Sequence, residues 1–179
     1  MQGASAGVPI PEGRTGAGGA HGARRDGKQE DSAVINVQRT MVVAAPLDDV
    51  VAYLEDFART VEWDPGTVRC VRLGDGPVET GATWRNTSRF RGRETELLYR
   101  LATRRRARLV FVGENGTVTA TDDMVFDALS DAVTRVTYRA SLRFKGLARL
   151  AAPFLRGEFE RLADATAERL PAAVAARLR

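Results

Sequence analysis

The chain has 179 residues, of which 27 are basic and 23 acidic, so its formal net charge is +4. It contains one histidine, His21, and one cysteine, Cys70. These counts exclude a Ser-His-Asp triad, a Cys-His pair and a four-ligand zinc site from the folded part, because His21 lies in a glycine-rich stretch.

The glycine-rich stretch is residues 1–31, where Val8 and Ile10 are the only aliphatic residues larger than alanine. Such a segment cannot bury enough apolar surface to offset its ordering entropy. We therefore predict a disordered tail over 1–31, one domain over 32–172 and a frayed end over 173–179. We expect no metal and no cofactor. The longest apolar run has seven residues, against about 18 for a membrane helix, and no secretory signal pattern is present, so a cytoplasmic protein is predicted.

The folded part begins with a β-branched run over 34–43, which predicts a strand. Pro46 suits a helix start, and apolar residues then recur at helical spacing from Leu47 to Leu54, which predicts a short helix. A second helical piece around Phe57 should end at Trp63-Asp64-Pro65-Gly66, because the residue before a proline disfavours the helical region.

Six further strand-like runs follow, separated by turn sequences, at about 67–74, 80–90, 93–103, 107–114, 117–128 and 132–144. Asn115-Gly116 predicts a hairpin with a type I′ turn. A long helix is then expected from about Gly146 to Leu170, kinked at Pro153. Its broad apolar face should carry Leu147, Leu150, Ala151, Phe154, Leu155, Phe159 and Leu162. Consecutive antiparallel strands followed by a long helix indicate an α+β fold.

This order of elements resembles the helix-grip fold of the SRPBCC or START-like (Bet v 1-like) superfamily, in its polyketide cyclase/dehydrase and lipid-transport branch. The motifs that carry the resemblance are Ala45-Pro46-Leu47-Asp48-Asp49-Val50, Glu62-Trp63-Asp64-Pro65-Gly66, Gly81-Ala82-Thr83-Trp84 and Gly146-Leu147-Ala148-Arg149-Leu150. The resemblance covers about residues 33–170. It implies a seven-stranded antiparallel sheet curved around the C-terminal helix, two short helices between the first two strands, and a cavity for an apolar or amphipathic small molecule.

Side-chain alternation supports such a cavity, because the predicted strands have an apolar face and a cationic face. The residues predicted to line it are aromatic, methionine and small polar residues: Trp84, Asn86, Ser88, Tyr99, Phe111, Met124, Phe126, Tyr138 and Phe154. Each apolar member, taken alone, is also compatible with plain core packing.

The weak candidates for proton transfer are Asp122, Glu158, Tyr99 and Tyr138, since no histidine is available. For Glu158 the favoured interpretation is a solvated glutamate or a partner of Arg161. Segment 85–108 holds nine arginines, which an anionic partner would use, but no aromatic residues interleave on that face, so we do not expect nucleic acid.

The sequence therefore predicts a protein that binds a hydrophobic or amphipathic small molecule, lipid or polyketide-like, between sheet and helix. An enzyme of polyketide cyclase, aromatase or dehydratase type in the same cavity is the alternative, and an interaction module using the arginine-rich face is a second alternative. The sequence does not determine which ligand is bound, whether the protein carries that ligand or catalyses a reaction on it, or the oligomeric state.

Overall fold

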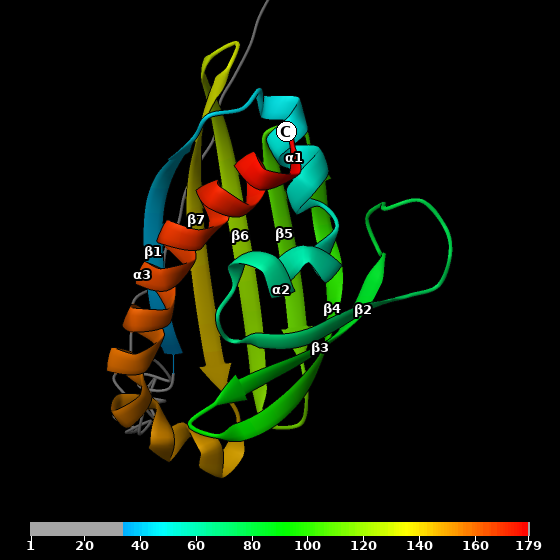
Figure 1. The fold of residues 1–179 in the computed structure, drawn as a ribbon. Helices are drawn as coiled ribbons and strands as arrows, with labels where there is room; N and C mark the ends of the chain where they lie inside the picture. The colour runs from blue at the N-terminus through cyan, green and yellow to red at the C-terminus, as the bar shows by residue number, and fades with distance from the viewer. Residues whose placement is uncertain (1–33, 179) are drawn as a thin grey trace, which may run out of the picture.

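The structure is a computed structural model that describes residues 34–178, so the tail predicted at 1–31 lies outside the described residues (Figure 1). Seven strands form one sheet: β1 (Val34–Val43), β2 (Thr67–Leu73), β3 (Thr83–Phe90), β4 (Arg93–Arg105), β5 (Arg108–Glu114), β6 (Val118–Ser130) and β7 (Val133–Phe144). Their order is β1-β7-β6-β5-β4-β3-β2 and every neighbouring pair is antiparallel. The predicted seven-stranded antiparallel sheet is confirmed.

Three short helical segments connect β1 to β2: α1 (Leu47–Leu54), η2 (Phe57–Arg59) and α2 (Thr60–Trp63). Asp56 caps η2, because its carboxylate accepts a hydrogen bond from the Ala58 backbone N–H at 3.2 Å. The predicted end of the second helical piece at Trp63 is confirmed. In Figure 1, α1 lies at the upper end of the sheet and α2 lies nearer its middle.

The C-terminal segment is a 3₁₀ helix, η3 (Gly146–Ala151), followed by α3 (Ala152–Arg177), which crosses the concave face of the sheet (Figure 1). Pro153 does not kink the helix, because it lies in the first turn of α3, where the missing N–H has no partner to lose. The helix also continues through Pro171 to Arg177, and Val174 is fully buried. The predicted frayed end is therefore wrong for residues 173–177.

The type I′ turn predicted at Asn115-Gly116 lies between β3 and β4 instead. Positive φ occurs there at Arg91 and Gly92, with values of 48° and 76°, so this two-residue turn has the type I′ conformation. Asn115 and Gly116 have no positive φ. The Asn115 side-chain oxygen accepts hydrogen bonds from the N–H groups of Thr117 and Val118, which makes a longer loop between β5 and β6.

The half of the concave face that lies under α1 and η2 is filled with side chains. The Phe57 ring stacks on Phe111 with centroids 4.3 Å apart, and the Trp84 ring meets Phe111 edge-on at 5.6 Å. Trp63, Leu101, Leu109, Met124 and Phe126 complete this fully buried cluster. A solid core thus occupies one end of the sheet.

The other end is less densely filled, because the inner face of η3 and the start of α3 carries small residues. Ala148 and Ala151 line the cavity on this side, whereas Leu147, Leu150 and Phe154 do not line it and are 87%, 75% and 75% exposed. The prediction that these three large residues pack on the sheet is wrong. Apolar residues therefore follow two neighbouring faces of this segment at helical spacing. The face with the smaller side chains, Ala148 and Ala151, is the one beside the cavity.

Candidate ligand-binding cavity

A cavity of about 450 Å³ lies between the sheet and α3, beyond the solid core. Its walls come from β1, β3, β4, β6, β7, η3, α3 and the segment after α2. The principal lining residues are Val37, Asp64, Ser88, Phe90, Arg93, Leu97, Tyr99, Thr117, Ala120, Asp122, Tyr138, Ala140, Leu142, Phe144, Ala148, Ala151, Leu155, Phe159, Leu162, Ala163 and Thr166. The volume falls in the range of about 300–1,000 Å³ that is typical of small-molecule sites.

The two ends of the cavity differ in chemistry. Its exposed lining residues, among them Arg93, Thr117 and Ala151, lie near the β3–β4 turn, the β5–β6 loop and η3, so the cavity opens there. Its inner end holds the buried residues Tyr99, Asp122, Tyr138 and Thr166. Between them the walls are mainly apolar. The arrangement suits a molecule with an apolar body and one polar group.

The polar inner end is centred on Asp122 of β6, which is 8% exposed. The Tyr138 hydroxyl, on the neighbouring strand β7, donates a hydrogen bond to Asp122 Oδ1 at 2.5 Å. Burial raises the pKa of Asp122 from its usual 3.8 to about 6; the bond from Tyr138 lowers it and the negative charge of Asp64 raises it further. Asp122 therefore exchanges a proton near neutral pH.

Tyr99 of β4 lies on the same wall, and a glycine positions its ring. Gly113 of β5 is directly opposite Tyr99 across the strand pair, and a Cβ built on Gly113 would come within 2.5 Å of the Tyr99 ring. The ring also packs on Phe57, with centroids 4.6 Å apart. Burial, followed by the Asp122 charge, raises the pKa of Tyr99 well above its usual value, so its hydroxyl stays protonated.

Asp64 also lines the cavity, although its sequence context indicates only the end of a helix. Its carboxylate accepts hydrogen bonds from the Gly66 N–H at 2.9 Å and from the Thr67 hydroxyl at 2.6 Å. Burial raises its pKa, while these two bonds oppose the rise. The available signal was the Trp63-Asp64-Pro65-Gly66 turn itself, which fixes a carboxylate at the end of a helix that faces the sheet.

Several residues predicted to line the cavity do not lie there. Trp84, Phe111, Met124 and Phe126 belong to the solid core, because α1 and η2 fill that end of the concave face. Asn86 is buried outside the cavity and donates to the Thr67 hydroxyl at 3.0 Å. Phe154 is exposed on the outer side of α3. For these six residues the predicted position is wrong, whereas Ser88, Tyr99 and Tyr138 do line the cavity.

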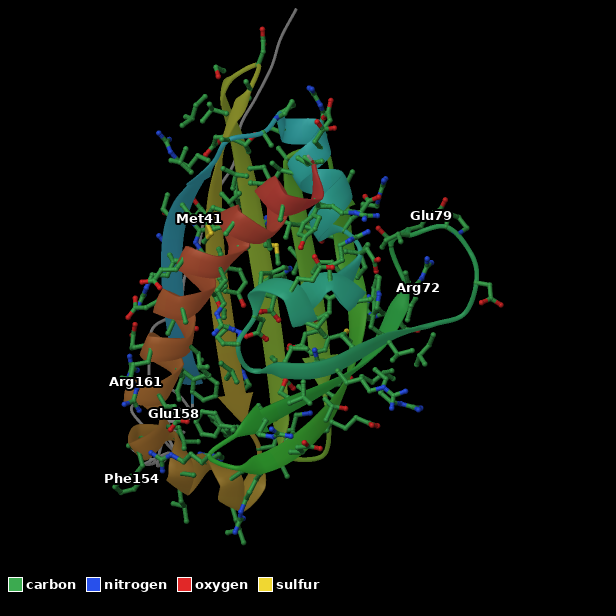
Figure 2. The ribbon with its side chains drawn as sticks, viewed as in Figure 1. Met41, Arg72, Glu79, Phe154, Glu158 and Arg161 are labelled. Carbon is green, nitrogen blue, oxygen red and sulfur yellow. The ribbon has the colours of Figure 1, made fainter. Side chains whose placement is uncertain are left out.

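Glu158 does not line the cavity either, but it contributes to the framework around the opening. Its carboxylate pairs with Arg91 at 2.9 Å and, more loosely, with Arg161 at 4.0 Å. Arg91 also donates to the Phe154 carbonyl at 3.0 Å, and the Phe90 ring stacks on Phe159 with centroids 4.8 Å apart. These contacts attach the β3–β4 turn to α3. Glu158 and Arg161 are labelled in Figure 2.

The arginine-rich segment 85–108 is largely neutralised by local acids. Six of its nine arginines form ion pairs. The pairs are Arg85 with Glu96, Arg89 with Glu94, Arg91 with Glu158, Arg104 with Glu55, Arg106 with Asp48, and Arg108 with Asp123. The predicted cationic face is therefore weaker than its composition indicates. Over residues 34–178 no helix has the length and apolar character that crossing a membrane requires.

An antiparallel sheet that wraps a long C-terminal helix, with a cavity between them, defines a helix-grip fold. The model of the polyketide cyclase/dehydrase and lipid transport family matches residues 34–175, and the chain belongs to this family. The resemblance seen in the sequence motifs is confirmed.

Solved structures share this fold at low sequence identity. The Zhui aromatase/cyclase from Streptomyces sp. R1128 is 18% identical with a TM-score of 0.69, and the match covers 82% of this chain and 96% of that one. The protein TTHA0849 from Thermus thermophilus is 14% identical (TM-score 0.65; 80% and 98% covered). A START superfamily protein from Mycobacterium smegmatis is 16% identical (TM-score 0.60; 79% and 95% covered). No curated protein matches the sequence.

Proposed function

We propose that this protein binds an amphipathic small molecule, lipid or polyketide-like, in the cavity between the sheet and α3. The observation that carries the proposal is the contrast within the cavity, where mainly apolar walls lead to the hydrogen-bonded pair of Asp122 and Tyr138. An ionised carboxylate has several lone pairs, so Asp122 can accept a further hydrogen bond beside the one from Tyr138, and the inner end favours a ligand that donates one.

The proposal is tested by filling the cavity. Ala120 lies on its wall, whereas Ala128 on the same strand is exposed, so Ala120→Phe and Ala128→Phe form a matched pair. Titration with the neutral dye Nile red should show binding to the wild type and to Ala128→Phe, with at least a tenfold loss in Ala120→Phe. Equal binding by all three proteins would place the dye outside the cavity and contradict the proposal.

The polar end is tested separately with 2-naphthol and naphthalene, which differ by one hydroxyl. We expect 2-naphthol to displace the dye more strongly than naphthalene, by about tenfold, because a hydrogen bond to a charged group contributes about 1.5–3 kcal/mol. The preference should disappear in Asp122→Leu, which retains the side chain's approximate size. A preference that survives in this variant would show that Asp122 does not contact the ligand's polar group.

A proton-transfer enzyme of cyclase or dehydratase type is a second candidate, because the pKa of about 6 allows Asp122 to act as an acid or a base near neutral pH. Tyr138 would orient this carboxyl, and the cavity would hold a flexible polyketone in one reactive conformer. On a synthetic poly-β-ketone thioester, Asp122→Asn should slow product formation by at least about tenfold. An unchanged rate would remove this candidate and leave the binding function.

A further inference from the structure

The outer side of η3 and the first turn of α3 carries an exposed apolar cluster, which consists of Leu147, Leu150 and Phe154. Their exposures of 87%, 75% and 75% are the three highest among the exposed large hydrophobic residues that the structure describes. Side chains three apart eclipse one another in a 3₁₀ helix, so Leu147 and Leu150 form a row that Phe154 extends. Figure 2 shows Phe154 pointing away from the sheet. An apolar cluster of this kind marks an interaction site.

The charged residues within this segment of the chain are all basic. Residues 145–156 include Lys145, Arg149 and Arg156 and no acidic residue. Arg149 and Arg156 are exposed and form no ion pair within residues 34–178, whereas Lys145 has a weak pair with Glu114 at 3.5 Å. Apolar side chains flanked by unpaired cations are the combination that binds the interface of an anionic bilayer.

The cluster also lies beside the cavity opening. Ala148, Ala151 and Leu155, each one residue after a member of the cluster, line the cavity from the inner side of the same helical turns. This segment forms the lower end of the molecule in Figure 1, so the cluster lies at an end of the fold rather than on a flat face. A projecting apolar end fits insertion between lipid headgroups, whereas a folded protein partner would need a groove of matching shape.

We propose that Leu147, Leu150 and Phe154, with Arg149 and Arg156, form a docking surface for an anionic phospholipid membrane. The three apolar side chains would enter the headgroup region, and the arginines would contact lipid phosphates. Docking would bring the cavity opening against the bilayer, from which an apolar molecule could pass without crossing water. The docking surface does not depend on which molecule the cavity binds.

The test uses the full chain and sedimentation with large unilamellar vesicles of phosphatidylcholine, alone or mixed with phosphatidylglycerol. We expect binding to the mixed vesicles, at least tenfold weaker binding to phosphatidylcholine alone, and loss of binding as NaCl approaches about 1 M, where the Debye length is about 3 Å. Arg149→Glu with Arg156→Glu should weaken binding by more than the roughly fivefold expected for each neutralised cation, because the charge is reversed.

The apolar contribution is tested with Leu147→Ser, Leu150→Ser and Phe154→Ser combined, which should reduce vesicle binding at least tenfold. The matched control is Val42→Ser with Leu98→Ser, since both residues are exposed on outer strand faces away from α3. Vesicle binding that is absent, or that the triple and control variants change equally, would overturn the proposal. A wild type that forms dimers in sedimentation velocity, lost in the triple variant without vesicle binding, would instead assign the cluster to a second copy.

The membrane surface and the cavity can fail independently. Nile red binding in vesicle-free solution should be the same for the wild type and the triple variant, because none of the three residues lines the cavity. Retained dye binding without vesicle binding would reject the docking surface alone. Retained vesicle binding without dye binding would reject the proposed cavity function alone.

Discussion

The ring of Tyr99 lies against the backbone of Gly113, so closely that a Cβ at position 113 would come within 2.5 Å of the ring. Residue 113 is opposite Tyr99 in the β4–β5 pair, and the φ of Gly113 is not positive. The glycine is therefore required for space and not for backbone conformation. It allows a large aromatic residue to lie along the sheet and leave the cavity open.

We predict that Gly113→Ala displaces the Tyr99 ring toward the cavity. Overpacking of this kind costs about 1–3 kcal/mol in stability, and Nile red affinity should fall at least tenfold. Gly116→Ala is the control, because nothing lies within 4 Å of a Cβ there. In a Tyr99→Leu background, Gly113→Ala should cost much less stability, since the clash is gone. A cost in urea unfolding that is unchanged by Tyr99→Leu would show that the ring is not the obstacle.

The pKa of Asp122 predicts a dependence of stability on pH. Its folded-state pKa of about 6 lies above the usual 3.8, so the unfolded chain releases this proton first as the pH rises. The contribution of Asp122 is therefore fully present below about pH 4 and is lost as the pH passes 6. The difference in unfolding free energy between wild type and Asp122→Asn should fall by about 2–3 kcal/mol from pH 4 to pH 7. A difference that rises over this range would mean that the carboxyl is ionised in the fold at low pH.

The hydrogen bond from Tyr138 to Asp122 should contribute more to stability than a similar bond near the surface. Tyr138→Phe leaves the buried carboxyl without this donor and should cost about 1–3 kcal/mol at pH 7. Tyr53→Phe is the control, because its partner Glu62, at 2.7 Å, is 40% exposed and can be solvated by water instead. Thermal unfolding of both variants makes the comparison, and equal losses would contradict a special role for burial at Asp122.

The ion pair of Arg91 with Glu158 should slow ligand exchange without adding much stability. Both residues are partly exposed, and such pairs contribute about 0.2–1 kcal/mol. The pair holds the β3–β4 turn against α3 beside the cavity opening, so release of a bound molecule should require it to break. Glu158→Gln should therefore raise the Nile red dissociation rate roughly two- to fivefold in stopped-flow measurements. Glu96→Gln, which breaks the Arg85 pair on the outer face, should leave the rate unchanged. The same increase in both variants would exclude a role for Glu158 at the opening.

Strand positions and facing could be predicted from the sequence, because alternation is a local property. Asp122, Met124 and Phe126 are all buried on the predicted inner face of β6. Whether an inward residue meets a cavity or solid core could not be predicted, since that depends on helices from other parts of the chain. Met124 contacts the core under α1 and η2, whereas Asp122 faces open space two residues earlier.

The orientation of the C-terminal helix shows a second limit. The predicted apolar face is too broad: Ala151, Leu155, Phe159 and Leu162 line the cavity, whereas Leu147, Leu150 and Phe154 are exposed. Helical spacing alone does not separate these two groups. The small Ala148 and Ala151 beside the cavity leave room for it. The turn sequence around Asp64 indicates where the helix ends, but whether this carboxylate reaches the cavity depends on how α2 packs on the sheet.

Native mass spectrometry of the protein purified from its natural host shows whether the cavity holds a small molecule. We expect a bound molecule in the wild type and in Ala128→Phe, and none in Ala120→Phe, whose new side chain occupies the cavity. A wild type that carries no molecule and takes up none from a panel of apolar and amphipathic compounds, or an Ala120→Phe variant that binds as the wild type does, would contradict the proposed cavity function.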